Sequence, residues 1–308
     1  MPEAVPRALV LANPIAGLGR AERLAQQAEQ LLQEAGFEVL RRATDKEEGA
    51  LPAAREHADQ ISLLVVAGGD GSIREAVAGL GPRARAVDIA VLPCGNANVV
   101  AREMGIPLDG REALALITGG QPRQVDIARA NGELFLAMLG VGWDARTVHW
   151  LARIRATRFG SAWYRFWADG LWFVAGFLAL YDPGPGRFEL HCEGAAQPAK
   201  GFGAVIANLR CYGKGWSMVP EADASSGSLH FQARRRAGPL FIVWQLIAAI
   251  GRRPLPAWVS AGGSASRIEL RASSPFLLQI DGDAREPASH ITLEVDPGAA
   301  RFRVPAAS

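Results

Sequence analysis

Residues 62–80, SLLVVAGGDGSIREAVAGL, contain an apolar strand pattern, a turn of three glycines around one aspartate, and the start of an amphipathic helix. A strand that leads into a helix through such a turn is typical of a parallel α/β sheet. Glycines let the backbone approach phosphate oxygens, and the exposed amides of a helix N-terminus favour anions. Asp70 in this turn could hold Mg²⁺ bridging phosphate groups. The alternative is a tight turn in which Asp70 only caps the helix.

The same alternation of strand and helix extends over the first part of the chain. Apolar β-like runs occupy residues 7–12, 37–40, 61–67 and 87–92, separated by helical stretches such as 21–35. The strand ends lead into three turns, NPIAGLG, AGGDGS and LPCGNAN. Because ligands of parallel sheets bind beyond the carboxyl ends of the strands, these turns predict one ligand site at one edge.

The pattern changes after about residue 122. The Asn-Gly pair at 131–132 separates two β runs and predicts a hairpin. Later β-like runs lack regular helices between them, which predicts a mainly antiparallel second domain. These runs are residues 201–208, 228–234, 266–272, 276–280 and 290–295. We place the domains at 1–128 and 129–308, with the last strand able to return to the first domain.

Composition limits the classes of function. At 308 residues with 49% hydrophobic residues, the chain is long enough for two cores. Its 33 basic and 31 acidic residues nearly balance, which argues against a nucleic-acid partner. Cys94, Cys192 and Cys211 show neither metal-ligand nor disulfide spacing, so we expect a reducing, cytoplasmic location. We also expect no signal peptide, since RALVLANP near the N-terminus has the pattern of a strand.

The sequence does not support two common nucleotide-binding motifs. No GxxxxGK[ST] sequence is present, so a P-loop is not supported. GVGWDA at 140–145 matches a relaxed dinucleotide-binding pattern, but it lacks the following βαβ unit and an acidic strand end. Chance explains this match better than cofactor binding.

Five motifs then occur in a fixed order along the chain. They are Asn13, Pro14 and Gly17; Thr44; Gly68, Gly69, Asp70, Gly71 and Ser72 with Glu75; Pro93, Gly95, Asn96 and Asn98 followed by Ala101–Arg102 and Gly105–Pro107; and Asp281, Gly282 and Asp283. With these motifs the chain resembles the diacylglycerol kinase catalytic-domain family, which includes YegS-like bacterial lipid kinases and sphingosine and ceramide kinases. The resemblance covers nearly the whole chain.

The resemblance implies a fold and an activity. The fold is an α/β nucleotide-binding domain of the phosphofructokinase and NAD-kinase type, a β-sandwich second domain, and an active site in the cleft between them. The activity is phosphoryl transfer from ATP, with Mg²⁺, to a lipid hydroxyl. ATP-binding residues would be Asn13, Thr44, Gly68, Gly69, Asp70, Gly71, Ser72, Glu75, Gly95, Asn96 and Asn98. Asp70 and Asp281 would hold Mg²⁺, and the catalytic residues would be Asp283 as general base together with Asp281 and Asp70.

The chain departs from the family at several of these positions. Ser72 and Asn96 replace threonines, and both can still form hydrogen bonds. Asp283 replaces a glutamate and is shorter by roughly 1.5 Å of reach, so either the backbone moves inward or Asp281 shares the role of base. On local sequence alone, Asp-Gly could equally be a hairpin turn without chemistry. In segment 219–229, Ser225 and Ser226 stand where the family has two metal-binding aspartates, which leaves a structural Mg²⁺ through Asp223 open.

Two apolar stretches bear on the acceptor and the partners. Residues 149–181 combine arginines with tryptophans, and residues 239–254 combine an apolar run with two arginines. Such segments suit a lipid headgroup boundary, or they are packed helices of the second domain. Their apolar cores are shorter than the roughly 20 residues that span a bilayer. We expect a peripheral protein at the inner face of the membrane, acting on diacylglycerol, a sphingoid base, phosphatidylglycerol or a polyprenol, with a homodimer left open.

The sequence leaves two rival functions open. One is a soluble phosphotransferase similar to NAD kinase, which would share the GGDG turn. The other is a lipid- or nucleotide-binding protein with a decayed active site, suggested by the substitutions at positions 96, 225, 226 and 283.

Overall fold

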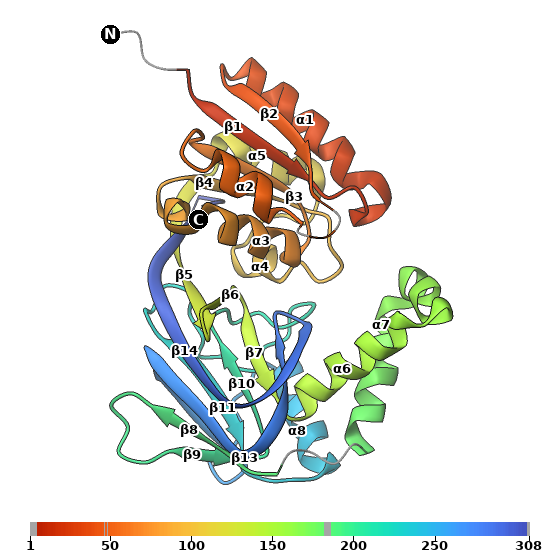
Figure 1. Ribbon diagram of the computed structural model, residues 1–308, viewed down its shortest axis with the longest axis vertical. Helices are drawn as coiled ribbons and strands as arrows, with labels where there is room; N and C mark the ends of the chain where they lie inside the picture. Colours follow the sequence, from red (N-terminus) through yellow and green to blue (C-terminus); the bar gives the residue numbers. More distant parts are fainter. Residues whose placement is uncertain (1–4, 46, 48, 182–185, 307–308) are drawn as a thin grey trace. The chain divides into compact units, whose positions relative to one another are not determined.

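The computed structural model describes residues 5–306 except 46, 48 and 182–185, and the chain forms two compact units (Figure 1). Unit 1 comprises the residues up to Ile127, the segment Gly213–Gly215 and the residues from Asp296 onward; unit 2 comprises Ala128–Tyr212 and Trp216–Val295. Strand β14 (Asp283–Val304) belongs to both units. A helix-breaking run, DPGPG at 182–186, lies outside the described residues except for Gly186.

Unit 1 is built on a parallel sheet with the strand order β2-β1-β3-β4, extended by the end of β14. The strands are β1 (Arg7–Ala12), β2 (Glu38–Ala43), β3 (Leu63–Gly68) and β4 (Asp88–Pro93). Every residue of β3 and β4 is buried. Such continuous burial is expected of parallel strands that are covered on both faces.

The helices of unit 1 provide these two covers. They are α1 (Arg20–Glu34), α2 (Leu51–His57), α3 (Asp70–Leu80), α4 (Val99–Glu103) and α5 (Gly110–Gly119), with the 3₁₀ turns η1 (Ala16–Gly19) and η2 (Gly81–Arg85). Right-handed crossovers in the order β2-β1-β3-β4 place α1 on one face and α2 and α3 on the other. In α1, Leu24, Ala28 and Leu32 recur at helical spacing and are buried. The predicted three-layer α/β architecture is confirmed.

Unit 2 is mainly antiparallel, as predicted. The Asn-Gly hairpin joins β5 (Gln121–Ala130) to β6 (Glu133–Phe135), with positive φ at Asn131 and Gly132. The other strands are β7 (Met138–Val141), β8 (Phe188–Cys192), β9 (Ala199–Gly201), β10 (Gly203–Ala207), β11 (Leu229–Arg234), β12 (Ser260–Ala265) and β13 (Arg267–Ile280). Their inward side chains form one core that includes Phe135, Phe188 and Phe276.

Strand β13 explains how this sheet curves around its core. Its first half pairs with β8, its last three residues pair with β7, and register shifts separate Arg271, Phe276 and Leu278 along its pairing with β14. Irregular pairing of this kind bends a strand and increases its twist. The two β runs predicted at 266–272 and 276–280 are therefore one bent strand.

Three helices complete unit 2: α6 (Trp143–Ala156), α7 (Arg158–Tyr181) and α8 (Pro239–Ile250). The arginine- and tryptophan-rich stretch 149–181 lies on a pair of helices, α6 and α7, that pack against each other around Leu151, Leu171 and Ala175. No helix among the described residues is both long and apolar enough to cross a membrane.

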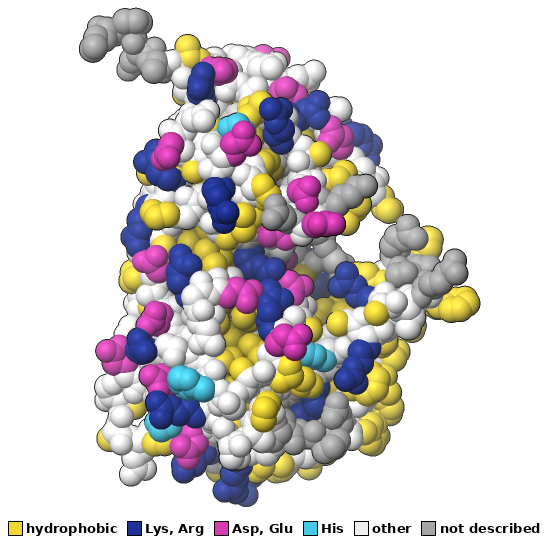
Figure 2. All heavy atoms as spheres, viewed as in Figure 1, with side chains coloured by type: hydrophobic (Ala, Val, Ile, Leu, Met, Phe, Trp, Pro, Cys, Tyr) yellow, Lys and Arg dark blue, Asp and Glu magenta, His cyan; other side chains and the backbone are white. Residues whose placement is uncertain are grey.

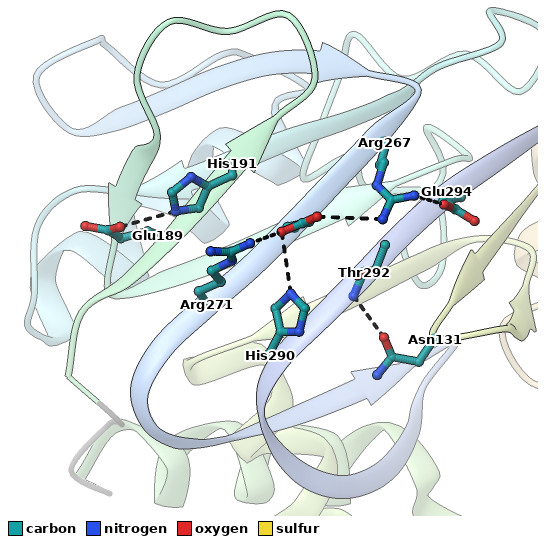
Figure 3. Close-up of polar contacts among 9 residues, drawn as sticks. Asn131, Glu189, His191, Arg267, Arg271, His290, Thr292 and Glu294 are labelled. Atoms are coloured by element: carbon teal, nitrogen blue, oxygen red, sulfur yellow. Dashed lines mark hydrogen bonds and ion pairs between the residues drawn. The ribbon is translucent and has the colours of Figure 1, made fainter.

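Ion pairs cover the solvent-facing side of β8, β13 and β14, as Figure 3 shows. Glu189 pairs with His191 at 3.3 Å within β8, and Arg267 of β13 pairs with Glu294 of β14. Glu269 pairs with Arg271 and lies 3.6 Å from His290. Because most of these groups are solvent-exposed, each pair contributes little to stability. We regard this surface as structural.

Candidate active site

The turn after β3 and the turn after β4 touch each other through two glycines. A Cβ atom on Gly95 would lie 2.7 Å from the Cα atom of Gly69, and one on Gly69 would lie 3.2 Å from the Cα atom of Gly95. A side chain on Gly95 does not fit in that space, and one on Gly69 would push the two turns apart by a few tenths of an ångström. The structure therefore brings the predicted AGGDGS and LPCGNAN turns together at the carboxyl edge of the sheet.

Asn13 connects the turn after β1 to the same place. Its Nδ2 atom donates a hydrogen bond of 3.1 Å to Ser72 Oγ, and its Oδ1 atom accepts one of 3.2 Å from the amide of Ile15. Ser72 is buried in the first turn of α3. The hydroxyl at position 72 thus keeps a defined partner although the family has threonine there.

Asp70 lies at the centre of these turns. Its Oδ1 atom accepts a hydrogen bond of 2.9 Å from the amide of Val100 at the start of α4. Burial raises the pKa of Asp70, and hydrogen bonds from backbone amides, that of Val100 foremost, oppose this rise. A carboxylate that has lost much of its hydration favours a cation partner.

Asn98 fixes the shape of the turn after β4. Its Oδ1 atom accepts from the amide of Gly95 at 2.9 Å, and its Nδ2 atom donates to the carbonyl of Gly95 at 3.0 Å. The backbone of Asn98 is left-handed, with φ of 51°, a conformation that asparagine tolerates well. Asn96 of the same turn is exposed.

Thr44 and Glu75 belong to the same edge through a further turn. Thr44 is buried directly after β2, and its amide donates to the carbonyl of Ala12 at 2.9 Å. Glu75 of α3 accepts a hydrogen bond of 3.0 Å from the amide of Ala50, and a Cβ atom on Gly49 would overlap the Glu75 carboxylate. Glu75 therefore holds the 49–50 turn, while its direct contact with a nucleotide stays a prediction.

The sequence reasoning missed Arg20, the first residue of α1. Its guanidinium donates a hydrogen bond to the carbonyl of Pro93, and its buried Nε atom has no hydrogen-bond partner. Burial raises the pKa of the neighbouring Cys94 thiol, and the positive charge of Arg20 opposes that rise. A cation beside the 93–98 turn is suited to phosphate, and its signal was the basic residue directly after GLG.

In unit 2, Asp281 and Gly282 form the two-residue turn between β13 and β14, with φ of 50° and 85°. The Asp281 carboxylate accepts hydrogen bonds from the amides of Leu136, Ala137 and Met138 at 2.8, 2.8 and 3.0 Å. It thereby fixes the segment before β7. A role of Asp281 in binding Mg²⁺ stays a prediction.

Asp283 follows this turn, and its side chain is half exposed. Its Oδ2 atom lies 3.8 Å from Arg285 Nη2. An accessible carboxylate on a rigid hairpin is suited to proton transfer. The role of Asp283 as a base stays a prediction.

A buried network, also missed from the sequence, supports the same turn. Asp144 accepts hydrogen bonds from the Tyr212 hydroxyl and from Gln279 Nε2, the latter at 2.8 Å, and Gln279 Oε1 accepts from the amide of Gly282 at 2.7 Å. Burial raises the pKa of Asp144, and burial together with the Asp144 charge raises that of Tyr212. The network connects the buried carboxylate of Asp144 to the turn that contains Asp281 and Gly282.

The structure also explains the GVGWDA pattern without a dinucleotide. A Cβ atom on Gly140 would overlap the Asp144 carboxylate, and one on Gly142 would lie 2.7 Å from the Cα atom of Gly203. β7, which precedes this segment, pairs antiparallel with β10 and β13, so no parallel βαβ unit is present here. Both glycines are needed for packing.

Metal-binding groups are sparse in the described part of the chain. No set of three His, Cys, Asp or Glu side chains gathers there. In segment 219–229, Asp223 Oδ1 accepts from the amide and hydroxyl of Ser225 at 3.0 and 2.8 Å, which makes a self-contained turn. In the turns that follow β1, β3 and β4, Asp70 is the carboxylate predicted to hold a cation, and this role stays a prediction.

Comparison with known proteins shows similarity to lipid kinases along most of the chain. Residues 7–130 match the diacylglycerol kinase catalytic domain. The chain is 28% identical to a Klebsiella pneumoniae (strain 342) protein named "Probable lipid kinase YegS-like", over 97% of this chain and 96% of that protein. It is 24% identical to the "Diacylglycerol kinase" of Bacillus subtilis (strain 168), over 90% and 89%. A crystal structure of a diacylglycerol kinase from Bacillus anthracis str. Sterne shares the fold, with a TM-score of 0.71 at 18% identity over 99% of both chains. Residues 7–130 therefore match the catalytic domain of diacylglycerol kinases, and most of the chain is similar to proteins named as lipid kinases.

Proposed function

We propose that the protein transfers the γ-phosphoryl group of ATP to a hydroxyl group of a lipid that is held in a membrane surface. The observation that carries this proposal is the convergence of the turns after β1, β3 and β4 beside Asp70, with backbone amides and the Arg20 guanidinium beside them. Glu75 of α3 connects the 49–50 turn to the same helix. This arrangement suits a polyphosphate better than a neutral ligand, because it combines cationic and N–H donors with glycines.

The phosphates of ATP would lie against the backbone of residues 68–72 and against Asn13, with Thr44 and Asn98 close by. Mg²⁺ fits Asp70, because this metal commonly binds proteins through one or two carboxylates and completes its coordination with substrate phosphates and water. When bound, it would neutralise phosphate charge. The desolvated carboxylate of Asp70 favours such a cation.

Unit 2 would present the acceptor hydroxyl and its base. Asp283 would take the hydroxyl proton as the lipid oxygen forms its bond to the γ-phosphorus and the bond from that phosphorus to the β,γ-bridging oxygen breaks, which releases ADP. Such transfer depends mainly on positioning and charge neutralisation. The shorter reach of Asp283 compared with glutamate makes its placement on the rigid turn of Asp281 important.

The test is transfer of radiolabelled phosphate from ATP with Mg²⁺ to a total lipid extract in mixed micelles. Wild type should produce one labelled lipid, whose mobility identifies the acceptor, while Asp70→Ala and Asp283→Ala should produce at least about 100-fold less. Both variants should keep the thermal stability of the wild type within a few degrees. ATP binding without any labelled lipid would favour a binding protein, and labelled NADP from NAD would favour the soluble phosphotransferase.

A further inference from the structure

Helix α8 turns an apolar face outward. A surface helix of a soluble protein normally directs polar residues to solvent and apolar residues inward. In α8 the inward face contains Ile242 and Ala249 together with Gln245, whose Nε2 atom lies 3.4 Å from Gln232 Oε1 of β11. The outward residues, spaced three or four apart and between 43% and 74% exposed, are Leu240, Val243, Ile247 and Ile250.

Helix α7 adds a second exposed apolar row. Its last twelve residues, 170–181, contain no charged side chain. The exposed residues of this part are Phe173, Val174, Phe177 and Tyr181. α7 and α8 are neighbours, and Trp258 packs against Trp244 of α8 with ring centroids 5.3 Å apart. In Figure 2, hydrophobic side chains gather along the edge of unit 2 that carries α7 and α8. We call these exposed residues of α7 and α8, together with Trp258, the α7–α8 face.

Arginines flank the α7–α8 face. Arg235 and Arg236 precede α8, Arg252 and Arg253 follow it, and all four are exposed. Residues 235–258 include no aspartate or glutamate. Tryptophan rings beside arginines at the border of an apolar surface are typical of proteins that sit at the headgroup level of a bilayer. The face therefore combines an apolar centre with a cationic border.

We propose that the α7–α8 face docks on the surface of an anionic lipid bilayer. The apolar side chains would enter the boundary between headgroups and acyl chains, and the arginines would bind lipid phosphates. Two copies of this chain meeting through the same face would bring their arginine borders together, and like charges across an interface disfavour association. The proposal deepens the proposed function, which requires a lipid acceptor within reach of the enzyme.

The test is sedimentation of the full chain with vesicles, without nucleotide. One set of vesicles contains phosphatidylglycerol and phosphatidylcholine, and the other contains phosphatidylcholine alone. Val243→Asp combined with Ile247→Asp should lower the affinity for anionic vesicles at least about tenfold, since both side chains lose their apolar contact. Arg252→Gln combined with Arg253→Gln should lower it about tenfold on anionic vesicles only, and added salt should weaken the wild type in the same way.

The control is Val5→Asp, which places one aspartate, half the charge that the apolar double variant adds, on an exposed valine of unit 1. It should bind vesicles as the wild type does. All changed residues are exposed, so the variants should melt like the wild type, and the melting curve checks this. A wild type that ignores anionic vesicles, or an apolar double variant that binds them normally, overturns the proposal. So does a vesicle-free dimer that the apolar double variant dissociates, because the face would then be covered by a second copy.

Phosphoryl transfer in detergent micelles separates this proposal from the function on which it rests. Variants that lose vesicle binding but still phosphorylate micelle-dissolved lipid support the docking face. A wild type that binds anionic vesicles through this face but phosphorylates no lipid supports the docking proposal and refutes the kinase proposal.

Discussion

Replacing Gly71 by alanine should separate the stability of the fold from the binding of ATP. Gly71 is exposed in the first turn of α3, its φ is not positive, and nothing lies within 4 Å of the Cβ atom that alanine would add. In a helix, alanine is more favourable than glycine by about 0.5–1 kcal/mol, with a smaller gain in the first turn. Gly71→Ala should therefore raise the unfolding temperature by about 1–2 °C.

The same methyl group should weaken ATP binding. If phosphates lie against the backbone of residues 68–72, a Cβ atom at position 71 takes up space next to them. We expect at least about a tenfold rise in the Kd for ATP, which corresponds to about 1.4 kcal/mol. Titration calorimetry of ATP with Mg²⁺ measures this change. A Gly71→Ala protein that is more stable and binds ATP as tightly as the wild type would refute the placement of phosphates on this turn.

Gly95→Ala is the matched control, because it should act through the fold. Its Cβ atom would lie 2.7 Å from the Cα atom of Gly69 and 2.8 Å from Asn98 Oδ1. Forcing atoms into such a contact costs about 1–3 kcal/mol. Gly95→Ala should lose both stability and ATP binding, whereas Gly71→Ala should lose only binding. Equal stability of the two variants would contradict the close approach of the two turns.

Three further predictions concern side chains that hold the loops. Asp281→Ala should destabilise the protein by about 3 kcal/mol, because it leaves three backbone amides without their acceptor, whereas Asp281→Asn should cost about half as much, measured by urea unfolding. If Asp281→Asn also abolishes phosphoryl transfer while remaining folded, its charge takes part in the reaction. Glu75→Ala should raise the KM for ATP several-fold through loosening of the 49–50 turn, and Glu75→Gln should restore much of it. Burial raises the pKa of Asp144, so its carboxyl keeps its proton in the folded state at a pH where the unfolded chain has lost it. The contribution of Asp144 to the free energy of unfolding therefore falls as pH rises from the unfolded pKa to the folded pKa. Asp144→Asn should lack this decline. Equal pH slopes of the unfolding free energy in the two proteins, measured by urea unfolding, would contradict the prediction.

Sequence patterns identified the strands that have apolar side chains. Strand β12, which these patterns missed, shows why. β12 has the sequence SAGGSA, which shows no alternation of apolar and polar residues. Among the described strands it pairs with β11 alone, and a Cβ atom on Gly263 would meet the Phe231 ring at 3.0 Å. Gly263 thus makes room for an aromatic ring of the neighbouring strand. That requirement comes from tertiary packing and is invisible in the local sequence.

In the site, too, local features were predictable from the sequence and tertiary contacts were not. Glycine and asparagine at strand ends carry a local signal, so the turns around Asp70 were predictable. The Asp144 network joins residues that lie 68 and 135 positions apart, and no local pattern indicates such partners. In the sequence, Asp144 was part of a dinucleotide-like pattern. Its glycines in fact make room for the buried carboxylate and for β10.

The departures from the family at positions 72 and 96 do not affect the bonds that hold the turns together. Ser72 retains the hydroxyl that Asn13 binds, and the turn after β4 is held by Asn98, whereas Asn96 is exposed. A site that had lost its function would be free to lose the close contact of Gly69 with Gly95 and the part-buried carboxylate of Asp70, since both constrain the fold. Both are present, which argues against decay of these turns. A kinase and a nucleotide-binding protein would share the turns, so the reach of Asp283 is the feature on which the two predictions differ.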